Sequence, residues 1–79
     1  MITIKDALNE LNEQEKEQFE RFLLNLQPRD GQPQHSDLWS QIYDYCRDNE
    51  HEGLRKNVSN ILDLFNKGIK TIEGLYGGR

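Results

Sequence analysis

Apolar residues in this sequence recur every three or four positions, and no stretch of useful length alternates apolar and polar side chains as a β-strand does. At about 100° per residue, such spacing places the apolar side chains on one face of a helix. Four segments follow this pattern, at residues 3–11, 13–27, 37–48 and 54–76. The sequence therefore predicts an all-α protein, a small domain of three or four helices with a long C-terminal helix.

The first two segments carry the same kind of start signal. Thr3 with Asp6, and Asn12 with Glu15, have the spacing of a capping box, in which each side chain accepts a hydrogen bond from the other residue's backbone N–H. The polar run NEQEKEQ interrupts the apolar stripe between them. One helix over residues 3–27 and two nearly collinear helices both fit this pattern, and we favour two helices.

The main connection is predicted at residues 27–36, where QPRDGQPQ places two prolines and a glycine within eight positions. The helix that follows, at 37–48, gathers its apolar and aromatic residues within an arc of roughly 160°, so we expect this face to meet the core. Cys46 lies in the middle of that face, where a free cysteine behaves as a small hydrophobe. Because His35 stands about three turns away, no Cys–His nucleophile pair is expected.

The last segment contains two signals that disagree. Its apolar stripe runs from Leu54 to Tyr76 without a slip in register, which favours one helix of up to about 23 residues. The stretch NKGI around Gly68 has instead the form of a helix stop, with a glycine at C′ and an apolar residue after it. The continuous register indicates that the helix resumes after Gly68 or passes through it. Its distal half, residues 69–76, then either folds back as a separate short helix or meets another molecule. Residues 77–79 are expected to form a flexible tail.

Small size suggests that this chain associates with another molecule. A chain of 79 residues forms one domain, residues 1–79, and buries only about 60% of the surface that its unfolded form exposes. The predicted core consists of Phe19, Phe22, Leu23, Trp39, Ile42, Tyr43, Cys46, Val58, Ile61, Leu62 and Phe65. Such a core leaves the distal half of a long last helix uncovered, so we expect this half to meet a protein partner or a second copy. The predicted interface residues are Leu64, Gly68, Ile69, Ile72, Leu75 and Tyr76.

Charge is distributed unevenly along the chain. Residues 1–54 contain 12 acidic and 5 basic side chains, whereas residues 55–79 contain 2 acidic and 5 basic ones, and the net charge is −4. The outward arc of the last helix carries side chains of the types that contact bases and phosphates, namely Arg55, Lys56, Ser59, Asn60 and Lys67. A small DNA-binding transcriptional regulator is therefore our alternative prediction. It ranks second because an ordinary solvated helix face explains the same residues.

No catalytic or metal-binding motif is found in the sequence. It lacks the G-x-S-x-G, H-E-x-x-H and P-loop patterns, and its one cysteine and two histidines do not have the spacing of a zinc site. No run approaches the roughly 18 apolar residues of a membrane span. We expect a cytoplasmic, non-enzymatic protein without metal, cofactor, small-molecule substrate or membrane contact. Its predicted function is to bind a protein partner or itself, as a homodimer, and so to act as a small regulator or inhibitor.

Overall fold

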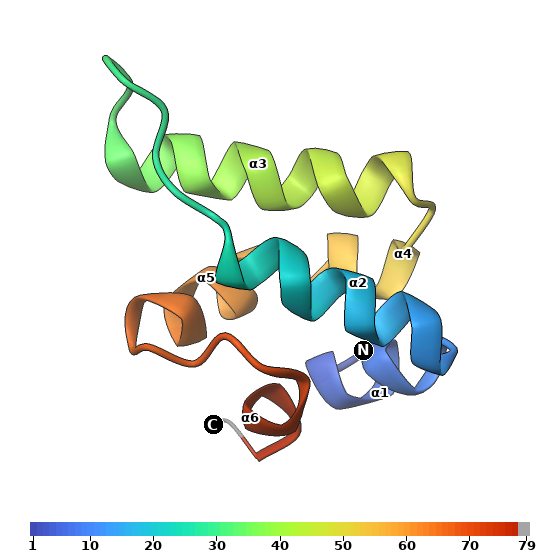
Figure 1. Cartoon of the computed structure of the whole chain (residues 1–79). Helices are drawn as coiled ribbons and strands as arrows, with labels where there is room; N and C mark the ends of the chain where they lie inside the picture. The colour runs from blue at the N-terminus through green and yellow to red at the C-terminus, as the bar shows by residue number, and fades with distance from the viewer. Residues whose placement is uncertain (78–79) are drawn as a thin grey trace.

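The computed structural model describes residues 1–77; Gly78 and Arg79, which belong to the predicted flexible tail, lie outside the described residues. Within residues 1–77 the chain forms six helices and no strand, so the all-α prediction is confirmed. The longest helix, α3 (Gln34–Asp48), lies across the top of Figure 1, and α2 (Glu13–Leu24) runs below it in the opposite direction. The remaining helices are α1 (Ile4–Asn9) and α6 (Ile72–Gly77), which lie below α2 in this view, α4 (Glu52–Arg55), which lies under the end of α3, and α5 (Val58–Asn66), which lies beside the end of α2.

Two capping boxes make α1 and α2 separate helices. The Thr3 hydroxyl accepts a hydrogen bond from the Asp6 N–H at 3.1 Å, and the Asp6 carboxylate accepts one from the Thr3 N–H at 3.3 Å. Asn12 and Glu15 repeat this exchange at 2.8 and 2.9 Å. Each pair satisfies N–H groups that have no partner inside the helix. Of the two alternatives for residues 3–27, the pair of helices is therefore correct.

The helix α3 begins earlier than predicted, so the loop before it is shorter. Pro33 stands at the N-cap with φ of −61°, a value that suits the entry to a helix. Asp37, in the first turn, is buried and accepts hydrogen bonds from the Arg29 backbone N–H at 2.8 Å and the Arg29 Nε–H at 2.6 Å. A third bond comes from Gln41 Nε2 at 2.7 Å. These bonds hold the loop against α3, and those from Arg29 lower the pKa of Asp37 most.

The prediction of one long C-terminal helix over residues 54–76 is wrong, because the chain forms three short helices there. The helix α5 ends in a Schellman motif, in which the Ile69 N–H donates to the Leu64 carbonyl at 2.9 Å. The Gly68 N–H donates to the Phe65 carbonyl, also at 2.9 Å. Gly68 has φ of 89°, which glycine adopts without a steric penalty. The helix therefore ends at the predicted stop signal, although the apolar register continues beyond it.

A second break separates α4 from α5. Asn57 is buried at this break, and its Nδ2 donates to the carbonyls of Ile2 and Gly53, both at 2.9 Å. The bond to Ile2 joins residues 55 positions apart. The predicted continuous helix is therefore replaced by a turn that holds the N-terminal residues in place.

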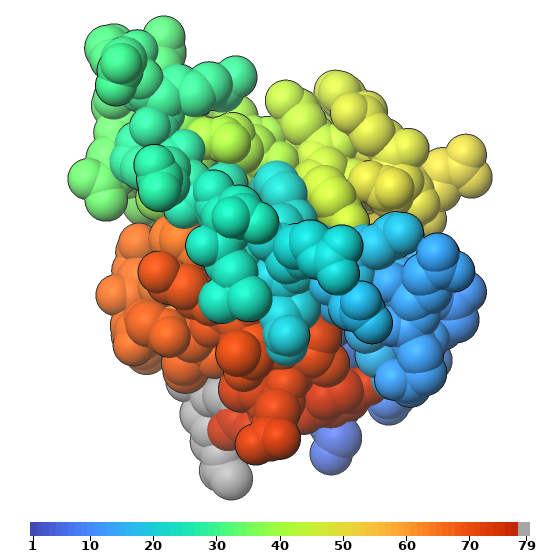
Figure 2. Space-filling model, in the orientation of Figure 1, coloured from blue at the N-terminus to red at the C-terminus, as the bar shows by residue number. Residues whose placement is uncertain are grey.

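Beyond Gly68 the chain folds back and places α6 against α1 and α2. The N–H of Ile72 donates to Glu20 Oε1 at 2.8 Å, and the Tyr76 hydroxyl donates to Asn9 Oδ1 at 2.9 Å. The ammonium group of Lys16 lies 5.5 Å from the centre of the Tyr76 ring, within the range of a cation–π interaction. In Figure 2 the red C-terminal residues lie in the body of the molecule, between the orange residues of α5 and the blue residues of α1.

One core joins the six helices. Its buried apolar residues are Ala7, Leu8, Phe19, Leu23, Leu26, Leu38, Ile42, Cys46, Leu54, Val58, Ile61, Leu62, Leu64 and Leu75. Of the predicted core, Phe22, Trp39, Tyr43 and Phe65 are only half-buried. Leu64 and Leu75, predicted for an interface, belong to the core, and Ile69, Ile72 and Tyr76 pack against it. The prediction that the C-terminal end carries an excess of uncovered apolar surface is therefore wrong, since the chain covers much of that surface itself.

Candidate binding groove

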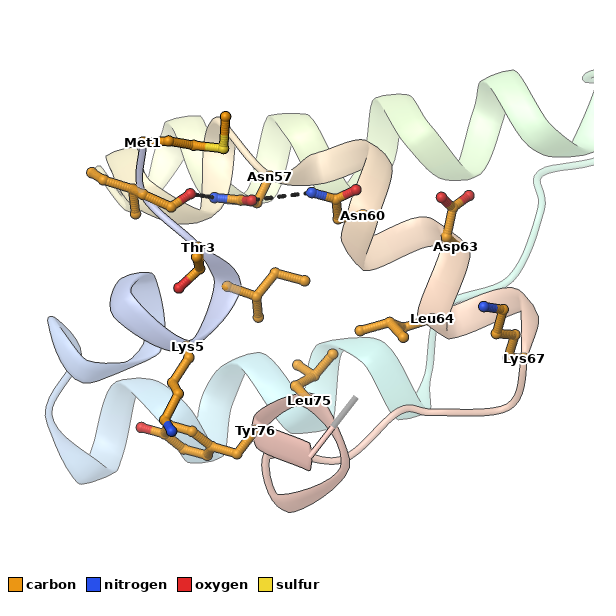
Figure 3. A pocket seen from close by; sticks show the side chains of 12 residues that line it. Met1, Thr3, Lys5, Asn57, Asn60, Asp63, Leu64, Lys67, Leu75 and Tyr76 are labelled. Carbon is orange, nitrogen blue, oxygen red and sulfur yellow. Dashed lines mark hydrogen bonds between the residues drawn. The ribbon is translucent and has the colours of Figure 1, made fainter. Parts of the chain in front are cut away.

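A groove of about 610 Å³ opens between the N-terminal segment, α5 and α6 (Figure 3). It is lined by residues 1–5 together with Asn57, Asn60, Asp63, Leu64, Lys67, Leu75 and Tyr76. Its volume lies within the range of roughly 300–1,000 Å³ that is typical of ligand clefts. The groove is partly open to solvent, so the side of another chain can enter it.

Helical spacing explains the wall that α5 contributes. Asn60, Asp63, Leu64 and Lys67 stand three, four and seven positions apart, which places them on one face of the helix. Figure 3 shows Thr3 and Lys5 on the opposite side, with Leu64 and Leu75 pointing into the space between. The turn at Gly68 is what brings α6 under α5, so the groove exists because the last helix is broken.

Two asparagines tie the N-terminal segment to the α5 wall. Asn57 donates to the Ile2 carbonyl, and Asn60 Nδ2 donates to Asn57 Oδ1 at 3.3 Å (dashed in Figure 3). Within residues 1–77, Asn60 Oδ1 accepts no hydrogen bond. The edge of the groove therefore offers a hydrogen-bond acceptor beside its apolar floor.

The charged side chains at the margin of the groove are exposed and lack partners. In the described part of the chain, Lys5, Asp63 and Lys67 form no ion pair within 4.0 Å, whereas six ion pairs form elsewhere. The margin carries two positive charges and one negative charge, in a chain whose net charge is −4. This local excess of positive charge favours the approach of carboxylates.

Residues from both predicted site sets meet in this groove. Leu64, Leu75 and Tyr76 come from the predicted protein interface, and Asn60 and Lys67 come from the predicted nucleic-acid surface. The other members of the predicted interface do not line it: Gly68 is exposed in the turn, while Ile69 and Ile72 are half-buried against the core. Sequence reasoning missed residues 1–5, Asn57 and Asp63, and the local pattern contains no signal of the contact between Asn57 and Ile2.

The rest of the predicted nucleic-acid surface is spread over two helices instead of one. Arg55 belongs to α4, and its Nη2–H and Nε–H donate to the Glu52 carboxylate at 2.7 and 2.8 Å, which raises the pKa of Arg55. Lys56 is exposed at the end of α4. Ser59 is the second residue of α5, and its Oγ accepts a hydrogen bond from the indole N–H of Trp39 at 3.1 Å. The single recognition helix expected for these residues is not formed.

The lone cysteine is unsuited to nucleophilic chemistry. Cys46 is fully buried, and burial raises the pKa of its thiol to about 12, so the thiol stays protonated near neutral pH. Among residues 1–77, no three His, Cys, Asp or Glu side chains gather as metal ligands, and no helix is both long and apolar enough to cross a membrane. Comparison with known proteins found no protein-family model, curated protein or solved structure that matches this chain.

Proposed function

We propose that this chain is a non-enzymatic protein-binding module whose groove holds an amphipathic helical segment of a partner, with acidic residues beside its apolar stripe. The observation that carries this proposal is the groove of about 610 Å³ with an apolar floor and a net positive margin. By binding this helix in its groove, the protein would regulate or inhibit the partner.

The apolar floor supports a helix as the occupant. Leu64 and Leu75 face the groove from two helices. Ile2 and Ile4, from the N-terminal segment, also line it and are half-buried. A helix that places apolar side chains at i, i+3, i+4 and i+7 presents one continuous stripe to such a floor. Burial of each large aliphatic side chain contributes about 1.5–3 kcal/mol. A few such anchors account for most of the affinity of a typical interface.

The margin supports acidic flanks on that helix. The ammonium groups of Lys5 and Lys67 have no carboxylate partner within residues 1–77, so a partner carboxylate would not have to break an existing ion pair. Exposed pairs of this kind contribute up to about 1 kcal/mol each and are weakened by salt. Charge therefore selects the partner and its orientation more than it sets the affinity.

The test is an NMR titration of the ¹⁵N-labelled chain with two synthetic helical peptides. Both carry leucine at i, i+3, i+4 and i+7, and their remaining positions are glutamate-rich in one and lysine-rich in the other. The glutamate peptide is expected to shift the amide signals of α5, α6 and residues 1–5, and to bind more tightly than the lysine peptide. Equal binding of both peptides, or shifts centred elsewhere, would contradict the proposal.

A pair of charge-reversal variants isolates the groove. Lys5→Glu combined with Lys67→Glu is expected to weaken the glutamate peptide by roughly tenfold at low salt. Lys56→Glu is the matched control, because Lys56 is an exposed lysine that does not line the groove. The control should leave the affinity nearly unchanged. If Lys56→Glu, which reverses one charge, costs half the binding free energy that the double variant costs, the peptide is responding to overall charge and not to this site.

A further inference from the structure

We infer that two copies of this chain exchange α6: residues 67–71 become helical, α5 and α6 of each copy join into one helix, and each α6 docks on α1 and α2 of the other copy. This self-association goes beyond the proposed binding of a partner helix. In the exchanged dimer, Leu75 and Tyr76 of each groove come from the second copy, so each groove is built from both chains.

The contacts that hold α6 do not require it to belong to the same chain. The Tyr76 hydroxyl bonds to Asn9, and Lys16 lies over the Tyr76 ring. Asn9 belongs to α1 and Lys16 to α2. The bond from the Ile72 N–H to Glu20 is given up, because in the joined helix this N–H donates to the Gly68 carbonyl. A second copy offers the same groups in the same geometry. Exchange therefore needs no new complementary surface, which is why it is a low-cost route to a dimer.

The linker keeps a helical pattern that the folded-back form does not use. Phe65, Gly68, Ile72 and Leu75 are spaced three, four and three residues apart, so the apolar register of α5 continues in phase into α6. In the folded-back form the five residues 67–71 form a turn and an irregular stretch, where no such register is required. As a helix, these five residues rise about 7.5 Å along the axis of α5, so α6 continues in the direction of α5 instead of turning back onto its own α1 and α2.

Gly68 decides between the two forms. It holds φ of 89° at the turn, a value that other L-residues adopt only with strain. A Cβ at this position would meet no atom within 4 Å, so alanine would encounter no clash there. In a continuous helix, by contrast, alanine is favoured over glycine. The substitution Gly68→Ala therefore disfavours the folded-back form and favours the straight one without altering any packing contact.

The experiment measures mass against concentration by sedimentation velocity for the wild-type chain and two variants. Gly68→Ala is expected to raise the dimerisation constant by roughly a hundredfold, because the left-handed strain of about 1–2 kcal/mol is relieved in both chains of the dimer. Gly31→Ala is the matched control: Gly31 has φ of 78° and also has nothing within 4 Å of its Cβ position, but it lies between α2 and α3. It should leave the dimerisation constant unchanged.

Exchange is distinguished from other dimers by isotope-filtered NOEs in a mixture of labelled and unlabelled Gly68→Ala chains. Contacts between the Tyr76 ring and Lys16 are expected to cross from one chain to the other. A Gly68→Ala chain that stays monomeric at every concentration, or a dimer whose Tyr76–Lys16 contacts remain within one chain, would overturn the inference. If Gly68→Ala does not fold, Gly68→Asn serves instead, since asparagine tolerates left-handed φ and should give an intermediate dimerisation constant.

Discussion

Replacing Gly53 with alanine is expected to destabilise the protein, although the same change in an ordinary helix is stabilising. Gly53 lies in α4, and a Cβ there would stand 2.8 Å from Ala7 Cβ, 3.1 Å from Ala7 Cα and 3.0 Å from Glu10 Oε1. Non-bonded carbon atoms are best separated by about 3.5–4.0 Å. Neither the Cα nor the Cβ of Ala7 moves by side-chain rotation. Relief therefore requires α1 and α4 to separate by roughly 1 Å.

The magnitude follows from two opposing effects. Forcing an extra methyl group into a well-packed contact typically costs about 1–3 kcal/mol. Alanine regains about 0.5–1 kcal/mol over glycine inside a helix, and the lower end applies because α4 has four residues. The net loss in the free energy of unfolding is about 1–2 kcal/mol. For a domain of this size each kcal/mol shifts the melting temperature by roughly 4–8 °C, so Tm should fall by about 5–15 °C.

Thermal unfolding followed by far-ultraviolet circular dichroism measures this change. In the double variant Gly53→Ala with Ala7→Gly the Cβ–Cβ contact is removed, so its loss of stability should be smaller than the sum of the two single losses. Gly74→Ala is a comparison, because its Cβ would meet the ends of the Ile69 and Thr71 side chains, at 2.8 and 3.0 Å, and not backbone. A Tm for Gly53→Ala at or above that of the wild type would refute the reasoning.

Three further predictions concern single sites. Glu50 has φ of 58°, a left-handed value that strains a residue with a side chain, so Glu50→Gly should raise the free energy of unfolding by about 1 kcal/mol. Urea denaturation measures this change, and a lower free energy of unfolding would show that the turn is not strained. Burial raises the pKa of the Cys46 thiol from 9.0 to about 12. The contribution of the protonated thiol to the free energy of unfolding is therefore complete below pH 9 and is lost as the pH rises toward 12. Near pH 10 the loss is about 1.4 kcal/mol. A Cys46→Ala variant whose alkaline loss equals that of the wild type would contradict this. The pKa of Asp37 lies below 3.8, chiefly through hydrogen bonds from Arg29, so its stabilising effect is present above that pH and is lost as the pH falls through the lowered pKa. Asp37→Asn should reduce the loss of stability at acidic pH, and an unchanged loss would argue against a stabilising pair of Asp37 and Arg29.

Features that depend on neighbours a few residues apart were predictable. The capping boxes at Thr3 and Asn12 start α1 and α2 as their spacing indicates, because donor and acceptor lie within one helical turn. The burial of Cys46 on the inner face of α3 follows from helical periodicity in the same way. Local hydrogen bonds and side-chain spacing thus account for the all-α class and for half of the buried core.

The course of the chain after α5 was left open by the sequence, which carries two opposing signals. The apolar register from Leu54 to Tyr76 favours one helix, while Gly68 favours a stop. Tertiary contacts decide between them: folding back buries Leu75 and lets Tyr76 bond to Asn9, 67 positions away. A straight helix in a single chain would leave these groups without partners.

By itself the sequence determined where α1 and α2 start, which faces are apolar and where the chain is able to stop, since each of these depends on atoms within about one turn. Only the tertiary structure decided that α6 turns back and that residues 1–5, α5 and α6 enclose a groove. Five lining residues of that groove could be named from the sequence, but only for two different surfaces. Their meeting depends on contacts such as Asn57 with Ile2, 55 positions apart, which form when the whole chain packs and leave no trace in local spacing.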